Sequence, residues 1–148
     1  PPRSTLFPYT TLFRSAEPSA KAKSLNLSSE VDLVEARCMV DRERLLQLLS
    51  NLIGNAIKFC PEGGSITVRA ARRGGEVECV VSDTGAGIPD VDLPHIFDPY
   101  WSAKDQAKKG TGLGLFISKG IVEAHRGRIW ADRRAGGGAE IHFTLPLA

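Results

Sequence analysis

Residues 42–59, RERLLQLLSNLIGNAIKF, carry the strongest structural signal in the chain. Apolar side chains recur there at spacings of three and four, which is the period of one helix face. The positions are Leu45, Leu48, Leu49, Leu52, Ile53, Ala56 and Ile57. Asp41 is a suitable N-cap, and Pro61 followed by Gly63-Gly64 ends the pattern. The stretch therefore predicts one long helix with a single buried face.

Three polar residues share another face of this helix. Asn51, Asn55 and Lys58 stand at positions i, i+4 and i+7. Asparagine is a modest helix former because its side chain competes for backbone hydrogen bonds. A solvated polar face would explain any one of them. The set suits a magnesium nucleotide, because amide oxygens are hard ligands and a lysine supplies positive charge for phosphate.

The flanking segments predict strands at residues 24–34, 36–40, 65–73, 76–83, 128–134 and 140–147, and a second helix at 114–125. Gly74-Gly75 indicates a hairpin between the third and fourth strands. Residues 88–109 hold three prolines and no sustained period, so we expect a long loop with one helical turn at most. The order predicts an α+β fold, a two-layer α/β sandwich. Its mixed, mostly antiparallel sheet would carry helices packed on one face.

Two glycine-dense stretches add a ligand site. DTGAGIP, residues 83–89, places Asp83 at a strand end, where its carboxylate can accept from an exocyclic amine. Its glycines let the backbone lie close to a flat ring. GTGLGL, residues 110–115, leads into a helix, an arrangement that binds anions, yet it fits neither the Walker A nor the dinucleotide pattern. Together the two stretches favour one nucleotide pocket.

Four motifs now resemble a known family. NLIGNAIKF (51–59), DTGAGIP (83–89), IFDPYW (96–101) and GTGLGL (110–115) are similar, in order, to the N, G1, F and G2 boxes of sensor histidine kinases. SKGIVEAHRGRIWA and GGGAEIHFTLPL near the end also fit. The chain over residues 24–148 resembles the catalytic and ATP-binding domain of these kinases. That domain is part of the gyrase, Hsp90, histidine-kinase and MutL superfamily, and the resemblance implies its Bergerat-type ATP-binding fold.

The resemblance implies a role for each matching position. Asn55 would hold Mg²⁺ with Asn51 beside it, Lys58 would meet the phosphates, and Asp83 would accept from the adenine amine. Asn51, Asn55 and Lys58 form the implied catalytic set. The implied cofactor-binding set is Asn55, Lys58, Phe59, Asp83, Gly85, Gly87, Ile88, Phe97, Lys104, Gly110, Thr111, Gly112, Leu113 and Gly114. Phe97 would anchor a lid over the nucleotide, and Gly110, Gly112 and Gly114 would act as the hinge of this lid.

Asn51 distinguishes between the kinases and the ATPases of this superfamily. ATPase members typically carry a water-activating glutamate at this position, and an amide cannot act as a general base. The resemblance thus implies ATP-dependent phosphoryl transfer to a protein histidine. His95, His125 and His142 all fall inside the ATP-binding domain and are interpreted as structural. The acceptor histidine would lie in a separate helical dimerisation domain upstream, and a response regulator receiver domain would be the further partner. The fragment itself is expected to be a monomer.

Two alternatives remain. A serine-directed kinase of the anti-sigma-factor type lacks the extended lid and F box, and Phe97 and Trp101 argue against it. A degenerate nucleotide-binding interaction module would have lost catalysis. The intact Asn55, Lys58 and Asp83 argue against that reading.

The first residues need separate treatment. Residues 5–15, TLFPYTTLFRS, resemble over their whole length the conceptual translation of a common sequencing-library adapter. We therefore interpret residues 1–15 as an assembly artefact, expected to be disordered, and residues 16–23 as a linker. The natural protein is then expected to continue upstream. Sequencing the source locus with different chemistry tests this hypothesis, because recovery of the same codons would contradict it.

The charge balance and the cysteines bear on the possible partners and the cellular compartment of the protein. The chain has 19 basic and 17 acidic residues, and without Arg3 and Arg14 the two counts are equal. This balance gives no hint of nucleic-acid binding. No apolar run approaches the roughly 18 residues of a membrane span. Three scattered cysteines, without a CxxC pair, fit core positions in a reducing, cytoplasmic setting, although the parent protein could be membrane-anchored.

One position departs from the family pattern. After EAH the family usually has two glycines, whereas this chain has Arg126-Gly127. If residue 126 is left-handed, arginine costs roughly 1 kcal/mol there.

Overall fold

The computed structural model describes residues 3–6, 9–32, 37–101 and 113–148. Its elements are β1 (Arg3–Leu6), α1 (Tyr9–Ala22), β2 (Asn26–Asp32), β3 (Arg37–Val40), α2 (Arg42–Phe59), β4 (Ser65–Arg73), β5 (Glu76–Asp83), the 3₁₀ turn η1 (Leu93–His95), α3 (Gly114–Ala124), β6 (Ile129–Arg133) and β7 (Ala139–Pro146). The predicted helix at 42–59 and the strands at 65–73 and 76–83 are confirmed with the same bounds. The other elements after residue 23 agree within a few residues, and the single turn η1 lies in the predicted loop.

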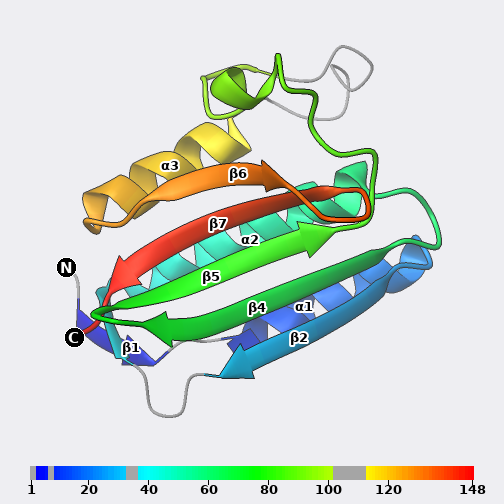
Figure 1. Cartoon of the computed structure of the whole chain (residues 1–148). Coiled ribbons are helices and arrows are strands. Elements are labelled where there is room, and N and C mark those ends of the chain that lie inside the picture. The colour runs from blue at the N-terminus through cyan, green and yellow to red at the C-terminus, as the bar shows by residue number, and fades with distance from the viewer. Residues whose placement is uncertain (1–2, 7–8, 33–36, 102–112) are drawn as a thin grey trace.

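The main sheet has five strands in the order β2-β4-β5-β7-β6. β2 pairs with β4 in parallel, and the remaining neighbours are antiparallel. α1 and α2 cover one face of this sheet, and α3 packs against α2, β6 and β7 (Figure 1). The predicted two-layer α+β sandwich, with a mixed, mostly antiparallel sheet and helices on one face, is therefore confirmed.

Helix α2 is fixed at its start by the predicted cap. The Asp41 carboxylate accepts from the backbone N–H groups of Glu43 (2.9 Å) and Arg44 (3.3 Å). These bonds, that of Arg44 first, hold the pKa of Asp41 below its ordinary value. Pro61 follows the C-cap residue Cys60, and α2 ends there because a proline cannot continue the hydrogen-bond pattern of a helix.

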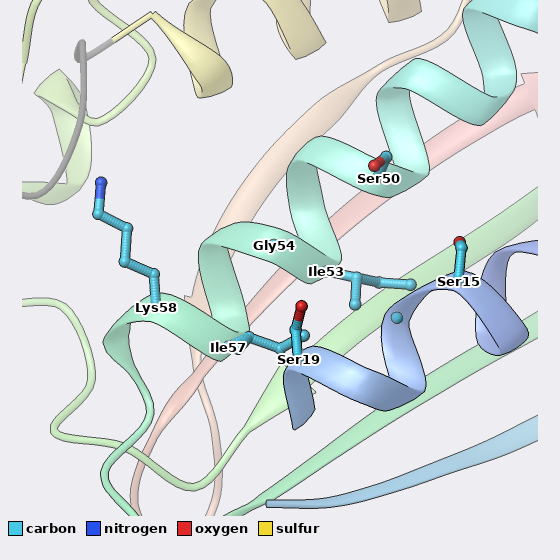
Figure 2. A pocket seen from close by; sticks show the side chains of 8 residues that line it. Ser15, Ser19, Ser50, Ile53, Gly54, Ile57 and Lys58 are labelled. Atoms are coloured by element: carbon cyan, nitrogen blue, oxygen red, sulfur yellow. The ribbon is translucent and has the colours of Figure 1, made fainter. Parts of the chain in front are cut away.

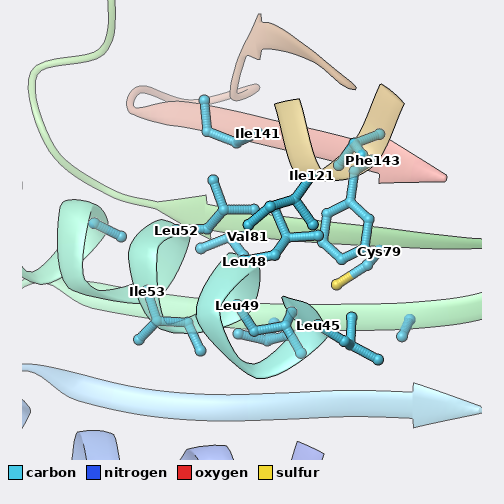
Figure 3. Packing of buried hydrophobic residues seen from close by; sticks show 14 of the residues in the cluster. Leu45, Leu48, Leu49, Leu52, Ile53, Cys79, Val81, Ile121, Ile141 and Phe143 are labelled. Carbon is cyan, nitrogen blue, oxygen red and sulfur yellow. The ribbon is translucent and has the colours of Figure 1, made fainter. Parts of the chain in front are cut away.

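The core lies between α2 and the sheet (Figure 3). From α2 it takes Leu45, Leu48, Leu49, Leu52, Ile53 and Ala56, all buried, whereas the predicted Ile57 is only partly buried. The sheet and α3 contribute Ile66, Val68, Cys79, Val81, Ile121, Ile141 and Phe143. Cys38, Cys60 and Cys79 are free and buried, as expected, and burial raises the pKa of Cys38 to about 11.

The N-terminal part carries more regular structure than the sequence predicts. β1 and α1 lie within residues 1–23, whose division into an artefact segment and a linker stays a prediction. β1 pairs antiparallel with β3, and α1 packs against α2 through Phe13, Ala16 and Ala20. These three residues have helical spacing, and α1 is amphipathic over its 14 residues. No helix was predicted there because the segment resembles an adapter translation and contains Pro18. The hypothesis on the origin of residues 1–15 stays a prediction.

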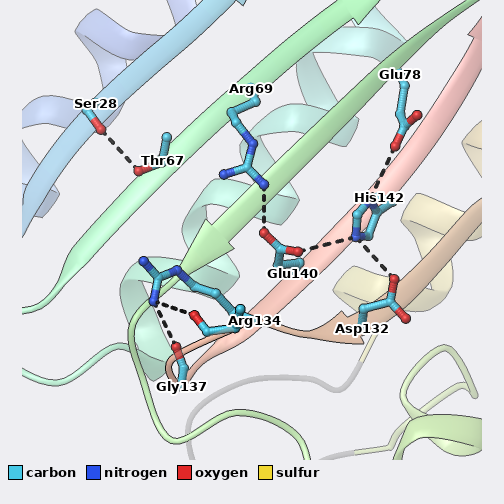
Figure 4. A network of polar contacts seen from close by, with 10 residues as sticks. Ser28, Thr67, Arg69, Glu78, Asp132, Arg134, Gly137, Glu140 and His142 are labelled. Atoms are coloured by element: carbon cyan, nitrogen blue, oxygen red, sulfur yellow. Dashed lines mark hydrogen bonds and ion pairs between the residues drawn. The ribbon is translucent and has the colours of Figure 1, made fainter. Parts of the chain in front are cut away.

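The face of the sheet that lacks helices carries a network of ion pairs (Figure 4). Arg69 pairs with Glu140 (2.7 Å) and Arg73 with Glu78 (2.9 Å). His142 stacks on Trp130, with ring centroids 5.0 Å apart, and approaches Glu78 and Glu140. Burial acts to raise the pKa of Glu140, but the hydrogen bond and charge of Arg69 outweigh it, so this pKa lies below its ordinary value.

This network makes stability depend on pH in a defined direction. A carboxyl whose pKa is lowered on folding stabilises the fold above its unfolded pKa, and this contribution is lost as the pH falls through the folded pKa. Glu140→Gln is expected to lower the free energy of unfolding by about 0.5–1 kcal/mol at pH 7 and by nearly nothing near pH 3. Urea unfolding of both proteins across this range measures the difference. A deficit that stays constant with pH would contradict the assignment.

Arg126 adopts the left-handed conformation, with φ = 64°. This confirms the strained backbone anticipated from the departure of the sequence at this position. Glycine removes the clash of the side chain with its own backbone, so Arg126→Gly is expected to raise stability by about 1 kcal/mol, or about 3 °C in Tm. Lys119→Gly is the matched control, because it removes a cation from an ordinary helical position of α3 and is expected to destabilise by about 1 kcal/mol. Thermal unfolding of both variants measures the contrast.

Candidate nucleotide-binding site

The polar face predicted on α2 is present. Asn51, Asn55, Lys58 and Phe59 are partly exposed, and they lie beside the buried stripe of the same helix. The Lys58 ammonium lies 5.1 Å from the centre of the Phe59 ring, and Figure 2 shows this side chain pointing away from α1. One exposed helix face thus presents two amides and a cation, as a site for a metal-bound phosphate chain requires.

Asn51 connects this face to the start of α3. Its side-chain amide donates to the backbone carbonyl of Gly114 over 3.4 Å. Ser118, one turn along α3, donates to the same carbonyl over 2.8 Å. The first and last of the four motifs therefore meet, because Gly114 belongs to the GTGLGL stretch.

Asp83 lies at the C-terminal end of β5, in the middle of the main sheet. Its carboxylate accepts from the backbone N–H of Gly85 over 2.8 Å. Burial raises the pKa of Asp83 above its ordinary value, although the N–H groups of Gly85 and Ala139 and the charge of Arg134 favour the ionised form. A partly desolvated carboxylate of this kind binds a donor more strongly than a carboxylate in water does.

The loop after Asp83 passes directly beside the end of α2. A Cβ added at Gly85 would come 3.0 Å from the Asp83 carboxylate and 3.3 Å from the carbonyl oxygen of Phe59. Gly87 has φ = +79°, a conformation that side chains disfavour. Two glycines of the DTGAGIP motif are thus required by close packing and by backbone geometry, and the loop forms a wall next to Lys58 and Phe59.

The segment after this loop is attached to the core by apolar side chains. Ile96 is buried, and Ile88, Phe97, Trp101 and Leu115 pack partly buried against the same cluster. Phe97 is therefore held by the core, and its role as the anchor of a lid stays a prediction. Tyr100, in contrast, is 75% exposed.

Several predicted site residues lie outside the described part of the chain, namely Lys104, Gly110, Thr111 and Gly112. Leu113 and Gly114 are described, at the N-terminal end of α3. Within the described ranges, no group of three or more His, Cys, Asp or Glu side chains is arranged to hold a metal ion. The same ranges contain no helix long and apolar enough to cross a membrane.

A hollow of about 310 Å³ lies on another side of α2, between α1 and α2 (Figure 2). Its lining is Ser15, Ala16, Ser19, Ser50, Ile53, Gly54, Ile57 and Lys58. Asp83 and the glycine loop are absent from that lining, so the hollow shares only Lys58 with the candidate site. Near it, Lys23 donates to the carbonyls of Ile57 (2.8 Å) and Lys58 (2.9 Å) and so caps the last turn of α2.

The three histidines make contacts within the domain. His125 uses both ring nitrogens, since Nδ1 contacts the Ile121 carbonyl over 2.7 Å and Nε2 accepts from the Asp41 N–H over 3.2 Å. It thereby connects the end of α3 to the start of α2. His142 belongs to the open-face network, and His95 pairs with Asp98 over 3.1 Å.

Sequence reasoning assigned no role to the turn between β6 and β7. Gly138 lies against Asp83 and Thr84, and Arg134 contributes to the electrostatics of Asp83. The run of three glycines at 136–138 was a visible signal of special backbone geometry. Its contact partner is distant in sequence, so no local pattern could identify it.

The fold and the arrangement of the four motifs define the class of protein. The family described as histidine kinase-, DNA gyrase B- and HSP90-like ATPase matches residues 40–148, and the chain belongs to this family. Its fold is that of histidine kinase catalytic domains, the ATP-binding part of those enzymes. The resemblance inferred from the four motifs is thereby confirmed.

The chain is similar in sequence to sensory kinases. The chain is 39% identical over 132 residues to the adaptive-response sensory kinase SasA of Synechococcus sp. strain JA-2-3B'a(2-13), covering 88% of this chain and 35% of that protein. It is 44% identical over 109 residues to SasA of Nostoc sp. strain PCC 7120, covering 72% and 27% respectively. The chain therefore spans about a third of the length of these relatives.

Solved structures show the same fold. The catalytic domain of histidine kinase ThkA has a TM-score of 0.87 at 30% identity, over 97% of this chain and 95% of that one. Full-length ShkA in complex with AMPPNP has a TM-score of 0.84 at 29% identity, over 100% of this chain and 32% of that one. ThkA in complex with response regulator protein TrrA has a TM-score of 0.80 at 29% identity, over 98% of this chain and 42% of that one.

Proposed function

We propose that this chain is the catalytic unit of a two-component sensor histidine kinase, transferring the γ-phosphoryl group of ATP to a histidine on a separate helical domain. The observation that carries the proposal is the convergence of three motifs. Asn51 on α2 bonds to Gly114 at the start of α3, and the loop that follows Asp83 packs against Phe59 at the end of α2. One pocket edge thus combines an adenine acceptor with a polar helix face for phosphates.

The roles follow from the chemistry of each group. Asp83 accepts from the adenine amine, and its glycine loop lies along the base. Lys58 offers positive charge to the phosphates. Asn55, with Asn51 beside it, presents a neutral oxygen ligand suited to Mg²⁺, whose contribution when bound is to neutralise charge on the phosphates. Leu113 and Gly114, together with Lys104, Gly110, Thr111 and Gly112, complete the proposed phosphate side.

Asn51 favours transfer to a protein over hydrolysis. Its amide cannot remove a proton from water, and it donates to the Gly114 carbonyl. Catalysis then depends on positioning the γ-phosphate and excluding water rather than on a general base of this chain. The F-box residues Phe97 and Trp101 pack against the core as an extended lid requires, which supports this reading over a serine-directed kinase.

The partners follow from the same proposal. The acceptor is a histidine of a helical dimerisation domain in the parent protein, and the subsequent acceptor is a response regulator receiver domain. ThkA, a structural neighbour, has been solved with a response regulator protein, which supports the second partner. We place the reaction in the cytoplasm, where ATP is available.

Calorimetric titration of the full chain with ATP tests the function. Adenine-selective binding is expected, with ATP bound at least tenfold more tightly than GTP and with affinity that changes when Mg²⁺ is removed. Transfer of label from [γ-³²P]ATP to an added histidine-containing helical domain is the second measurement. Binding without transfer would favour the degenerate interaction module, and absence of binding by a folded sample would contradict the proposal.

A further inference from the structure

The β6–β7 turn, residues 134–138, lies against the adenine-side loop, although the two segments are far apart in sequence. Gly136, Gly137 and Gly138 have φ values of 88°, 110° and 108°. Three consecutive residues with positive φ allow the turn to fold back on β5. Only glycine adopts such a run without strain.

Gly138 is the point of contact. It is buried, and a Cβ added there would overlap the carbonyl oxygen of Asp83 and come 3.0 Å from the Cα of Thr84. The carbonyl oxygen of Gly138 in turn lies 3.1 Å from the position of a Cβ on Gly87. The backbone of the turn thus packs on both ends of the loop that begins at Asp83.

Charged groups reinforce this packing. The Arg134 guanidinium donates to the carbonyls of Gly137 (3.1 Å) and Ala135 (3.4 Å), and so braces the turn (Figure 4). The Arg134 charge and the N–H of Ala139 also favour the ionised form of Asp83. Arg133 pairs with Asp90 over 2.6 Å, which joins the end of β6 to the far end of the same loop.

We propose that Gly138 and Arg134 are positioning residues for nucleotide recognition: Gly138 sets the place of the Asp83 peptide, and Arg134 holds the turn that carries Gly138 against it. This inference rests on the proposed function, because it assigns residues that position the same site. Neither residue touches the nucleotide. Their effect is expected on base selectivity, and the phosphate contacts of α2 are expected to be unchanged.

Gly138→Ala and Gly137→Ala form a matched pair. Their φ values differ by only two degrees, and both lie in the region that side chains disfavour. A Cβ on Gly137 meets nothing within 4 Å, whereas one on Gly138 overlaps Asp83. Gly138→Ala is expected to weaken ATP binding at least tenfold more than Gly137→Ala does. The ratio of ATP to GTP affinity is expected to fall in Gly138→Ala alone. Equal losses in the two variants would overturn the role of Gly138.

Arg134→Gln supplies a second readout, which holds even if Gly138→Ala does not fold. Without the Arg134 charge, the pKa of Asp83 rises further. ATP binding, which uses the ionised carboxylate, is then lost at a higher pH as the solution is acidified. ATP is expected to bind Arg134→Gln more weakly than the original chain at pH 7, and this binding is expected to be lost at a higher pH. Neither change is expected for Arg72→Gln, an exposed arginine of β4. Identical profiles would overturn the role of Arg134.

The two levels of the proposal separate cleanly in this experiment. If the unmodified chain fails to bind ATP, the proposed function itself fails. If the unmodified chain binds ATP with adenine selectivity and the variants match their controls, only the positioning role fails.

Discussion

Asn55→Ala is expected to abolish phosphoryl transfer to an added histidine-containing helical domain. A metal held at the phosphates contributes several kcal/mol to such a transition state, which corresponds to a loss of about a hundredfold or more. ATP binding by the variant is expected to persist through Asp83 and to become insensitive to Mg²⁺. Label transfer and calorimetry with and without Mg²⁺ measure the two effects.

Gly54→Ala is the matched control for this experiment. Gly54 precedes Asn55 on α2, is exposed, and has nothing within 4 Å of an added Cβ. Alanine favours a helix interior, so this variant is expected to keep full transfer activity and to gain about 1 kcal/mol of stability. Unchanged transfer by Asn55→Ala would remove Asn55 from the site, and equal loss in Gly54→Ala would indicate a general disturbance of α2.

Asp83→Asn is expected to weaken ATP binding without lowering the stability of the fold. Loss of the charged acceptor weakens the bond to the adenine amine, and hydrogen bonds to charged groups contribute about 1.5–3 kcal/mol. The ATP dissociation constant should therefore rise about 10- to 100-fold, and the preference over GTP should fall with it. Competition of ATP and GTP for a fluorescent nucleotide measures both values.

The stability of this variant is expected to move in the opposite direction. Burial raises the pKa of Asp83, so its ionised form costs stability at neutral pH, and the cost is relieved as the pH falls through the raised pKa. The amide retains an oxygen to accept from Gly85 and carries no charge. Urea unfolding at pH 7 should show Asp83→Asn at least as stable as the original chain, with the difference disappearing in acid. A clear loss of stability at pH 7 would contradict this account of the site.

The N-terminal part shows where local pattern is insufficient. Phe13, Ala16 and Ala20 pack α1 against the core, although Pro18 lies between them and would be expected to interrupt a helix. The sequence predicts a strand at 36–40, and the structure shows it as β3 (Arg37–Val40), paired with β1 in a separate two-stranded sheet. Strand partners depend on which edges are available after the chain has folded, and an isolated strand of four residues does not encode them.

The sequence alone determined helix α2 and the polar face on it, because both depend on spacings of three and four within one element. It also determined the end of β5 at Asp83 and the glycine stretches, since turn chemistry and close backbone approach are local demands. Only the tertiary structure decided that Gly138 packs on Asp83 and that Asn51 meets Gly114. These contacts join segments separated by more than 50 residues. They arise when the sheet and helices pack, and no periodicity along the chain records that packing.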